Sequence, residues 1–134
     1  MIRAALAAAA LVVAGAPALA QDPADAAPRP AEPEVGVERG TGALLRGLDK
    51  VSGRTTDIPL RVGEAAAFGR LEVRLGECRY PAGDPSSDAF AQMTITDTVR
   101  GTTVFAGWMI ASSPALSALD DARYDIWVIS CQSA

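Results

Sequence analysis

The chain has 134 residues, with 16 acidic and 12 basic side chains, a net charge of −4, two cysteines and no histidine. The lack of histidine removes the usual general base near neutral pH and the commonest metal ligand, so a Ser-His-Asp triad is excluded and we expect no metal or other cofactor. A chain without an excess of basic residues also lacks the electrostatic footprint of a nucleic-acid-binding protein.

The first twenty residues have the pattern of a secretory signal peptide. Arg3 precedes an apolar run that ends in the small-residue triplet Ala18-Leu19-Ala20. We therefore expect cleavage after Ala20 and a periplasmic mature protein with no membrane span. An uncleaved membrane anchor is the alternative, but the run is short, rich in alanine and interrupted by Pro17.

Residues 21–41 are rich in Pro, Ala and Glu and carry almost no bulky apolar side chain. Such a segment buries too little surface to offset the entropy of ordering its backbone. The sequence predicts a disordered, partly polyproline-like tether here. A solvated leader with no task of its own is the alternative.

Residues 42–134 suffice for one small domain, and in a domain of this size a covalent cross-link matters. Cys78 and Cys131 are the only cysteines, so one pairing is possible, and an oxidising compartment permits it. In the chain-entropy model, closing a loop of this length contributes about 4 kcal/mol to stability. We predict a Cys78–Cys131 disulfide.

The first half of the domain predicts strands. Residues 43–48 are an apolar run, and residues 55–62 favour an edge strand because Pro59 cannot donate a ladder hydrogen bond. Residues 71–75 alternate strictly between apolar and charged side chains, the period of a half-buried strand. Cys78 has the opposite parity from Leu75, so we expect a β-bulge at Gly76 that returns Cys78 to the core side.

The second half predicts an exposed loop over residues 80–88 and a hairpin that joins residues 90–96 to residues 102–110. The second hairpin strand is apolar on both faces, which favours a central strand covered on both sides. A final strand over residues 124–131 carries Cys131 to Cys78.

A short α-helix is expected between the hairpin and the final strand. Ser113 can cap it, Pro114 suits its first turn, and Leu116 and Leu119 should be buried. The predicted fold is therefore mostly β: a small antiparallel β-sandwich or barrel-like domain with one short helix near the C-terminus and one disulfide.

Several segments resemble the DUF2155 family of exported alphaproteobacterial proteins. The similarity spans residues 45–131, and its most specific parts are the following segments: Leu48-Asp49-Lys50, Phe68-Gly69, Gly107-Trp108-Met109 with the residues up to Pro114, and Tyr124-Asp125-Ile126-Trp127-Val128. The resemblance implies a fold and a compartment but no chemistry. An accessory role linked to respiratory complex I is a further alternative that the resemblance raises.

Trp108 and Trp127 are the residues that the sequence singles out most clearly. We expect both in the core, because large aromatic side chains dominate burial in small domains. The alternative is an exposed lip that binds a partner, since aromatic and Met side chains are enriched in interface cores. That lip would contain Trp108, Met109, Ser112, Ser113 and Pro114, and Asp49 and Lys50 would form either a local ion pair or part of the same surface.

The remaining polar residues predict no catalytic site. Ser112 and Ser113 could be nucleophiles at a helix N-terminus, but capping is the simpler interpretation. Asp120 and Asp121 are expected to be solvated rather than to bind a cation. We expect a non-enzymatic periplasmic module that binds another envelope protein. The alternatives are a hydrolase that uses Ser113 and a small-ligand binder with a pocket lined by Phe105, Trp108 and Trp127.

Overall fold

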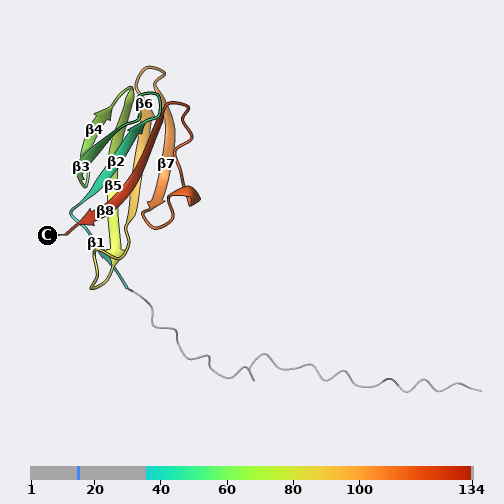
Figure 1. Ribbon diagram of the computed structural model, residues 1–134. Coiled ribbons are helices and arrows are strands. Elements are labelled where there is room, and N and C mark those ends of the chain that lie inside the picture. Colours follow the sequence, from blue (N-terminus) through green and yellow to red (C-terminus); the bar gives the residue numbers. More distant parts are fainter. Residues whose placement is uncertain (1–14, 16–35, 134) are drawn as a thin grey trace, which may run out of the picture. The chain divides into compact units, whose positions relative to one another are not determined.

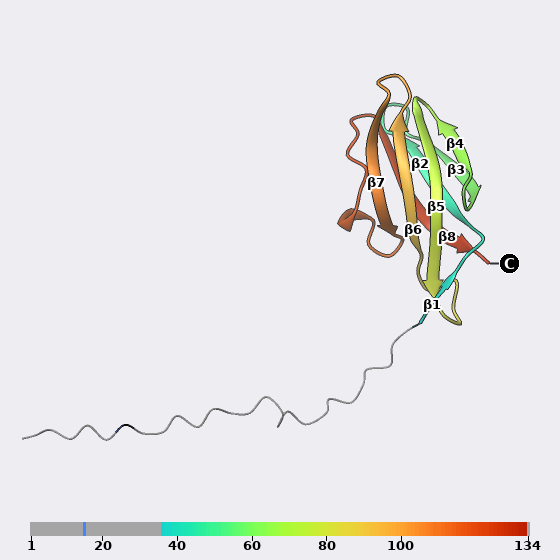
Figure 2. The ribbon, with the colours of Figure 1, turned by 180° about the vertical axis from the view of Figure 1, so that it is seen from behind.

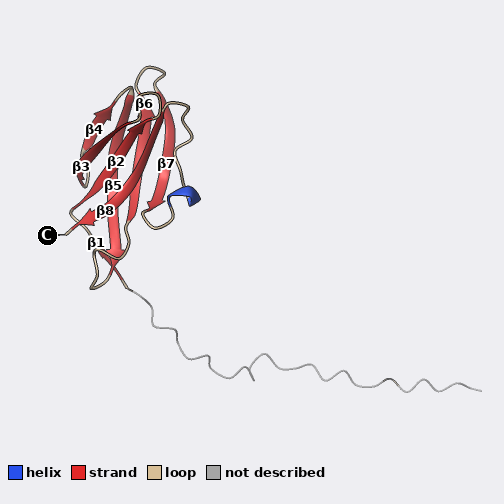
Figure 3. Ribbon diagram, viewed as in Figure 1, coloured by secondary structure: helices blue, strands red, loops and turns tan. Residues whose placement is uncertain are grey.

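The structure describes residue 15 and residues 36–133. Within 36–133, most of the chain forms antiparallel strands (Figure 1). This computed structural model contains two sheets that face each other, and one short 3₁₀ turn, η2, is the helical element within 36–133 (Figure 3). The elements are β1 (Val37–Arg39), β2 (Gly42–Asp49), β3 (Arg54–Arg61), β4 (Ala65–Phe68), β5 (Leu71–Pro81), β6 (Phe90–Asp97), β7 (Thr102–Ile110), η2 (Pro114–Leu116) and β8 (Tyr124–Gln132).

The larger sheet has the order β1-β5-β6-β7, and β4 also pairs with β5. Since β6 occupies one edge of β5, β1 and β4 share the other: β4 pairs with the first residues of β5 and β1 with the last (Figure 2). The smaller sheet has the order β3-β2-β8. All of these pairings are antiparallel, as predicted.

The core lies between the sheets and is filled by the inward-facing residues of both. The strand pattern predicted for residues 71–75 is confirmed, because Leu71, Val73 and Leu75 are fully buried while the charged residues between them are exposed. The largest fully buried apolar side chains are Leu45, Leu71, Leu75, Met93, Ile95, Met109 and Ile126.

Two β-bulges bring the cysteines to the inside. In β5, Leu75 pairs with Met93 and Glu77 with Gln92, so Gly76 is the extra residue, as predicted. In β8, the register against β2 shifts in the same way at Ile129. Each bulge reverses the side-chain parity of its strand. Cys78 and Cys131 consequently both point inward and form the predicted disulfide, with Cα atoms 5.7 Å apart, which joins the two sheets.

Several other local predictions are confirmed. β3 is an edge strand, and it contains Pro59. β6 and β7 form a hairpin, and Gly101 in its turn has φ of +69°, a conformation that glycine adopts at little cost.

The predicted α-helix near the C-terminus is wrong. Only a 3₁₀ turn forms at Pro114–Leu116, and Ser113 makes no side-chain capping bond. Leu119 is buried as expected, but Leu116 is 76% exposed. The Ser112 hydroxyl donates to Asp88 Oδ2 at 2.7 Å, which fixes the chain to the loop before β6 rather than to a helix start.

Two further predictions need correction. β7 is an edge strand of the larger sheet, not a central strand covered on both sides. Its inner face packs on the core through Met109, whereas its outer face carries Trp108 at the surface, and this explains why both faces are apolar. Residues 37–39, predicted to lie in the tether, form β1, because pairing with the end of β5 supplies hydrogen bonds that the local sequence does not reveal.

The predicted signal peptide and most of the predicted tether lie outside the described residues. Within the described part, we find no helix that is long and apolar enough to cross a membrane.

The inter-sheet disulfide leads to a stability prediction. We expect the double substitution Cys78→Ser with Cys131→Ser to lower the free energy of unfolding by about 4 kcal/mol, because the unfolded chain loses its long closed loop. Urea unfolding of both proteins with and without reductant measures this difference. The reductant should destabilise the wild type alone; an unchanged wild-type midpoint would contradict the prediction.

Candidate functional site

Trp108 lies on the outer face of the larger sheet, where its side chain is 38% exposed. It borders a shallow depression with a volume of about 250 Å³. The depression is lined by Val37, Arg79, Phe90 and Trp108, one residue from each of β1, β5, β6 and β7. We call these four residues the Trp108 surface. The expectation that Trp108 belongs to the core is therefore wrong, because its side chain lies at the surface.

Arg79 is held in place at the centre of the Trp108 surface. Its guanidinium carbon lies 5.1 Å from the centroid of the Trp108 ring, a cation–π arrangement. Glu77 accepts from Arg79 Nε at 2.9 Å and from Arg79 Nη2 at 3.1 Å, and Arg39 Nε lies 3.0 Å from the same carboxylate. The hydrogen bond from Arg79 lowers the pKa of Glu77. The side chains of the Trp108 surface are thus held in place by contacts within the chain.

The lip predicted around Trp108 does not exist as one surface. Met109 is 1% exposed and belongs to the core. Ser112 is bonded to Asp88, and burial, which raises the pKa of Asp88, is outweighed by hydrogen bonds from Ser112 and Ala89 that lower it. Pro114 lines a separate depression beside Trp127. Only Trp108 of the predicted lip lies in the Trp108 surface.

Asp49 and Lys50 lie at the other end of the sandwich, where β2 ends and β8 begins. They do not pair with each other. Asp49 Oδ2 accepts from Arg123 Nη2 at 3.1 Å, and Lys50 Nζ donates to the backbone oxygen of Asp121 at 2.7 Å. Both residues tie the β2–β3 turn to the chain before β8.

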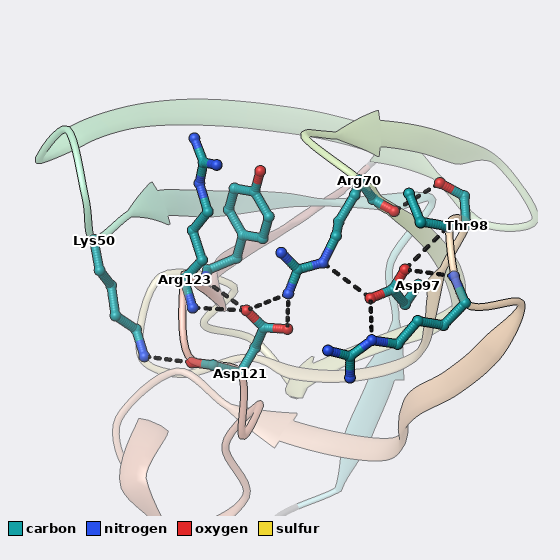
Figure 4. A network of polar contacts seen from close by, with 9 residues as sticks. Lys50, Arg70, Asp97, Thr98, Asp121 and Arg123 are labelled. Carbon is teal, nitrogen blue, oxygen red and sulfur yellow. Dashed lines mark hydrogen bonds and ion pairs between the residues drawn. The ribbon is translucent and has the colours of Figure 1, made fainter.

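A buried ion network closes this end of the molecule (Figure 4). The Arg70 guanidinium lies between two carboxylates, with Nε 2.9 Å from Asp97 Oδ2 and Nη2 3.0 Å from Asp121 Oδ2. The Asp97 side chain is 1% exposed, and the Asp121 side chain is 7% exposed. Asp121, expected to be solvated, is therefore buried and paired. The network joins the β4–β5 turn, the β6–β7 turn and the chain before β8.

The two carboxylates of the network titrate below their ordinary range. The Arg100 N–H and the Arg70 guanidinium lower the pKa of Asp97 despite its burial. Burial raises the pKa of Asp121, but the N–H groups of Tyr124 and Arg123 together with Arg70 hold it below its ordinary value. Both groups therefore stabilise the fold as anions.

The pocket predicted from Phe105, Trp108 and Trp127 is not formed. Phe105 pairs with the inward-facing Ile95 and packs against the core, whereas Trp108 faces outward. Trp127 lies between the buried Ile126 and Val128, so it faces outward from the smaller sheet. These three side chains lie on different faces of the sandwich.

Sequence reasoning missed the residues that surround Trp108 and those that form the ion network. The bulge at Gly76 places Glu77 and Arg79 on the outer face, so extending the predicted parity past Gly76 could have found Arg79. Nothing local in the sequence indicates that Arg70 would meet Asp121, because the two residues are 51 positions apart.

Comparisons with known proteins assign the chain to a family. Residues 43–131 match the family described as "Uncharacterized protein conserved in bacteria (DUF2155)", and the chain belongs to this family. An uncharacterized protein of Rickettsia prowazekii (strain Madrid E) is 30% identical over 94 residues, which cover 68% of this chain and 61% of that relative. The chain thus matches about three fifths of the relative's length. No solved structure matches the chain.

The ion network leads to a prediction about pH. Because the folded pKa of Asp121 lies below its unfolded value of about 3.9, its contribution is present above that value and is lost as the pH falls through the folded pKa. We expect Asp121→Asn to lower the free energy of unfolding by about 2 kcal/mol at pH 7 and to weaken the loss of stability as the pH falls below about 4.

Urea unfolding at several pH values measures both effects, and Asp120→Asn, at the exposed neighbouring residue, is the matched control. Equal effects of the two substitutions at all pH values would contradict the role given to Asp121.

Proposed function

We propose that this protein is a non-enzymatic, exported interaction module that binds another envelope protein through the Trp108 surface. The observation that carries the proposal is the exposed, preordered Trp108, with Arg79 stacked on its ring and Glu77 holding Arg79 in place. Tryptophan and arginine are the residue types that most often dominate binding energy at protein interfaces.

The partner's chemistry follows from the charges around Trp108. Arg39 and Arg79 share the single carboxylate of Glu77, so one positive charge is left beside an apolar patch formed with Val37 and Phe90. A complementary partner surface is apolar at its centre and acidic at its rim. Since Arg79 is already ordered, binding costs little side-chain entropy.

Export to the periplasm is supported by two features. The first twenty residues have the composition of a cleavable signal peptide. A disulfide in a small domain suits an oxidising compartment. We therefore propose a periplasmic location and a mature chain that begins at Gln21.

The proposed partner surface can be tested in the native host. We expect Trp108→Ala to reduce the recovery of a specific cross-linked envelope protein by about tenfold or more, because a central interface aromatic is removed. Quantitative mass spectrometry after cross-linking measures the recovery, and Leu116→Ala, at another exposed apolar residue, is the control. The same set of proteins in both variants would contradict the proposal.

The proposed export has its own test. Mass spectrometry of the protein purified from the periplasmic fraction should give a mass that corresponds to a chain starting at Gln21. Replacing Ala18 and Ala20 with bulky residues should block this cleavage, because the peptidase requires small side chains there. An intact chain in the cytosolic fraction would contradict the proposal.

A further inference from the structure

A second depression lies at the end of the sandwich opposite the disulfide, outside the Trp108 surface. Its volume is about 390 Å³. The β2–β3 turn, the β4–β5 turn and the start of β8 surround it, and its lining combines two guanidiniums, one carboxylate, three hydroxyls and two aromatic rings. The lining residues are Asp49, Ser52, Arg54, Thr56, Phe68, Gly69, Arg123 and Tyr124.

Tyr124 supplies an unused hydrogen-bonding group to this depression. The residue is 6% exposed, with Phe68 edge-on at 5.4 Å and the Arg70 and Arg123 guanidiniums each 5.3 Å from its ring centroid. Its hydroxyl forms no hydrogen bond with the residues in the described part of the chain. Since no buried side-chain N or O atom there lacks a partner, this hydroxyl reaches solvent.

Gly69 is the reason that the hydroxyl stays accessible. A Cβ atom at position 69 would overlap the Tyr124 hydroxyl, and the φ of +57° also disfavours any other residue there. The β4–β5 turn therefore requires glycine for its backbone and, at the same point, leaves room for the Tyr124 hydroxyl.

The charges around the depression favour an anion. Arg54 has no carboxylate within 4.0 Å among the described residues, whereas Arg123 pairs with Asp49 through Nη2. Two guanidiniums and one carboxylate leave one positive charge, which complements a monoanion. The Asp49 carboxylate would repel the second charge of a dianion.

We propose that this depression binds the carboxylate of a small organic anion. Arg54 and the Tyr124 hydroxyl donate to the carboxylate oxygens, and the Phe68 ring contacts the apolar part of the ligand. This assignment is independent of the interaction proposed for the Trp108 surface, because the two sites lie at different ends of the larger sheet.

The test uses sodium benzoate, benzamide and inorganic phosphate as probes. Each is titrated into the ¹⁵N-labelled protein at low ionic strength, and the amide resonances of Ser52, Arg54 and Gly69 report binding. We expect benzoate to bind about tenfold or more tightly than the neutral benzamide, a factor equivalent to about 1.4 kcal/mol. Equal binding of benzoate and benzamide, or tighter binding of phosphate, would overturn the assignment.

Two variants test the residues, and one serves as a matched control. Arg54→Gln and Tyr124→Phe should each weaken benzoate binding by about fivefold or more, whereas Arg61→Gln, at the other end of β3, should leave it unchanged. Tyr124→Phe should also retain the urea midpoint of the wild type, since the hydroxyl bonds to no described residue. Benzoate binding that survives both Arg54→Gln and Tyr124→Phe would overturn the proposal.

Discussion

The fold depends on a constraint of strand parity: two sheets can be cross-linked through their core only if both cysteines point inward. Cys78 and Cys131 each lie three residues beyond an inward-facing residue, Leu75 and Val128, so in regular strands both would face solvent. One bulge in β5 and one in β8 remove this conflict. The disulfide and the two bulges therefore form one structural unit. Without either bulge, one of the two cysteine side chains would point to solvent and the disulfide could not form.

At the opposite end of the sandwich, ion pairs join the two sheets in place of a disulfide. Arg70 bridges Asp97 and Asp121 and so joins the paired strands β5 and β6 of the larger sheet to the chain before β8, a strand of the smaller sheet. Trp108 on the outer face and the Tyr124 hydroxyl at the charged end belong to neither the disulfide unit nor the ion pairs of Arg70, and the two proposals rest on them.

The sequence allowed prediction wherever local pattern decides structure. Strict alternation located β5, parity located the Gly76 bulge, and turn residues located the β6–β7 hairpin. Predictions failed where residues far away in the sequence determine the local structure. The strand β1 forms because the end of β5 offers hydrogen bonds, and Asp121 is buried because it pairs with Arg70. The bulge at Ile129 could not be predicted from the sequence, because residues 126–129 are all apolar and show no alternation whose change would indicate a bulge. Similarly, the apolar residues on both faces of β7 predict a central strand, although β7 lies at the edge of the larger sheet.

The most direct test of this account is the oxidation state of the two cysteines in protein purified from its native host. Denaturation in the presence of an alkylating agent, followed by mass spectrometry, counts the free thiols. Because Cys78 and Cys131 form the disulfide, we expect no alkylated cysteine before reduction and two after it. Two alkylated cysteines before reduction would contradict the inter-sheet cross-link on which the architecture depends.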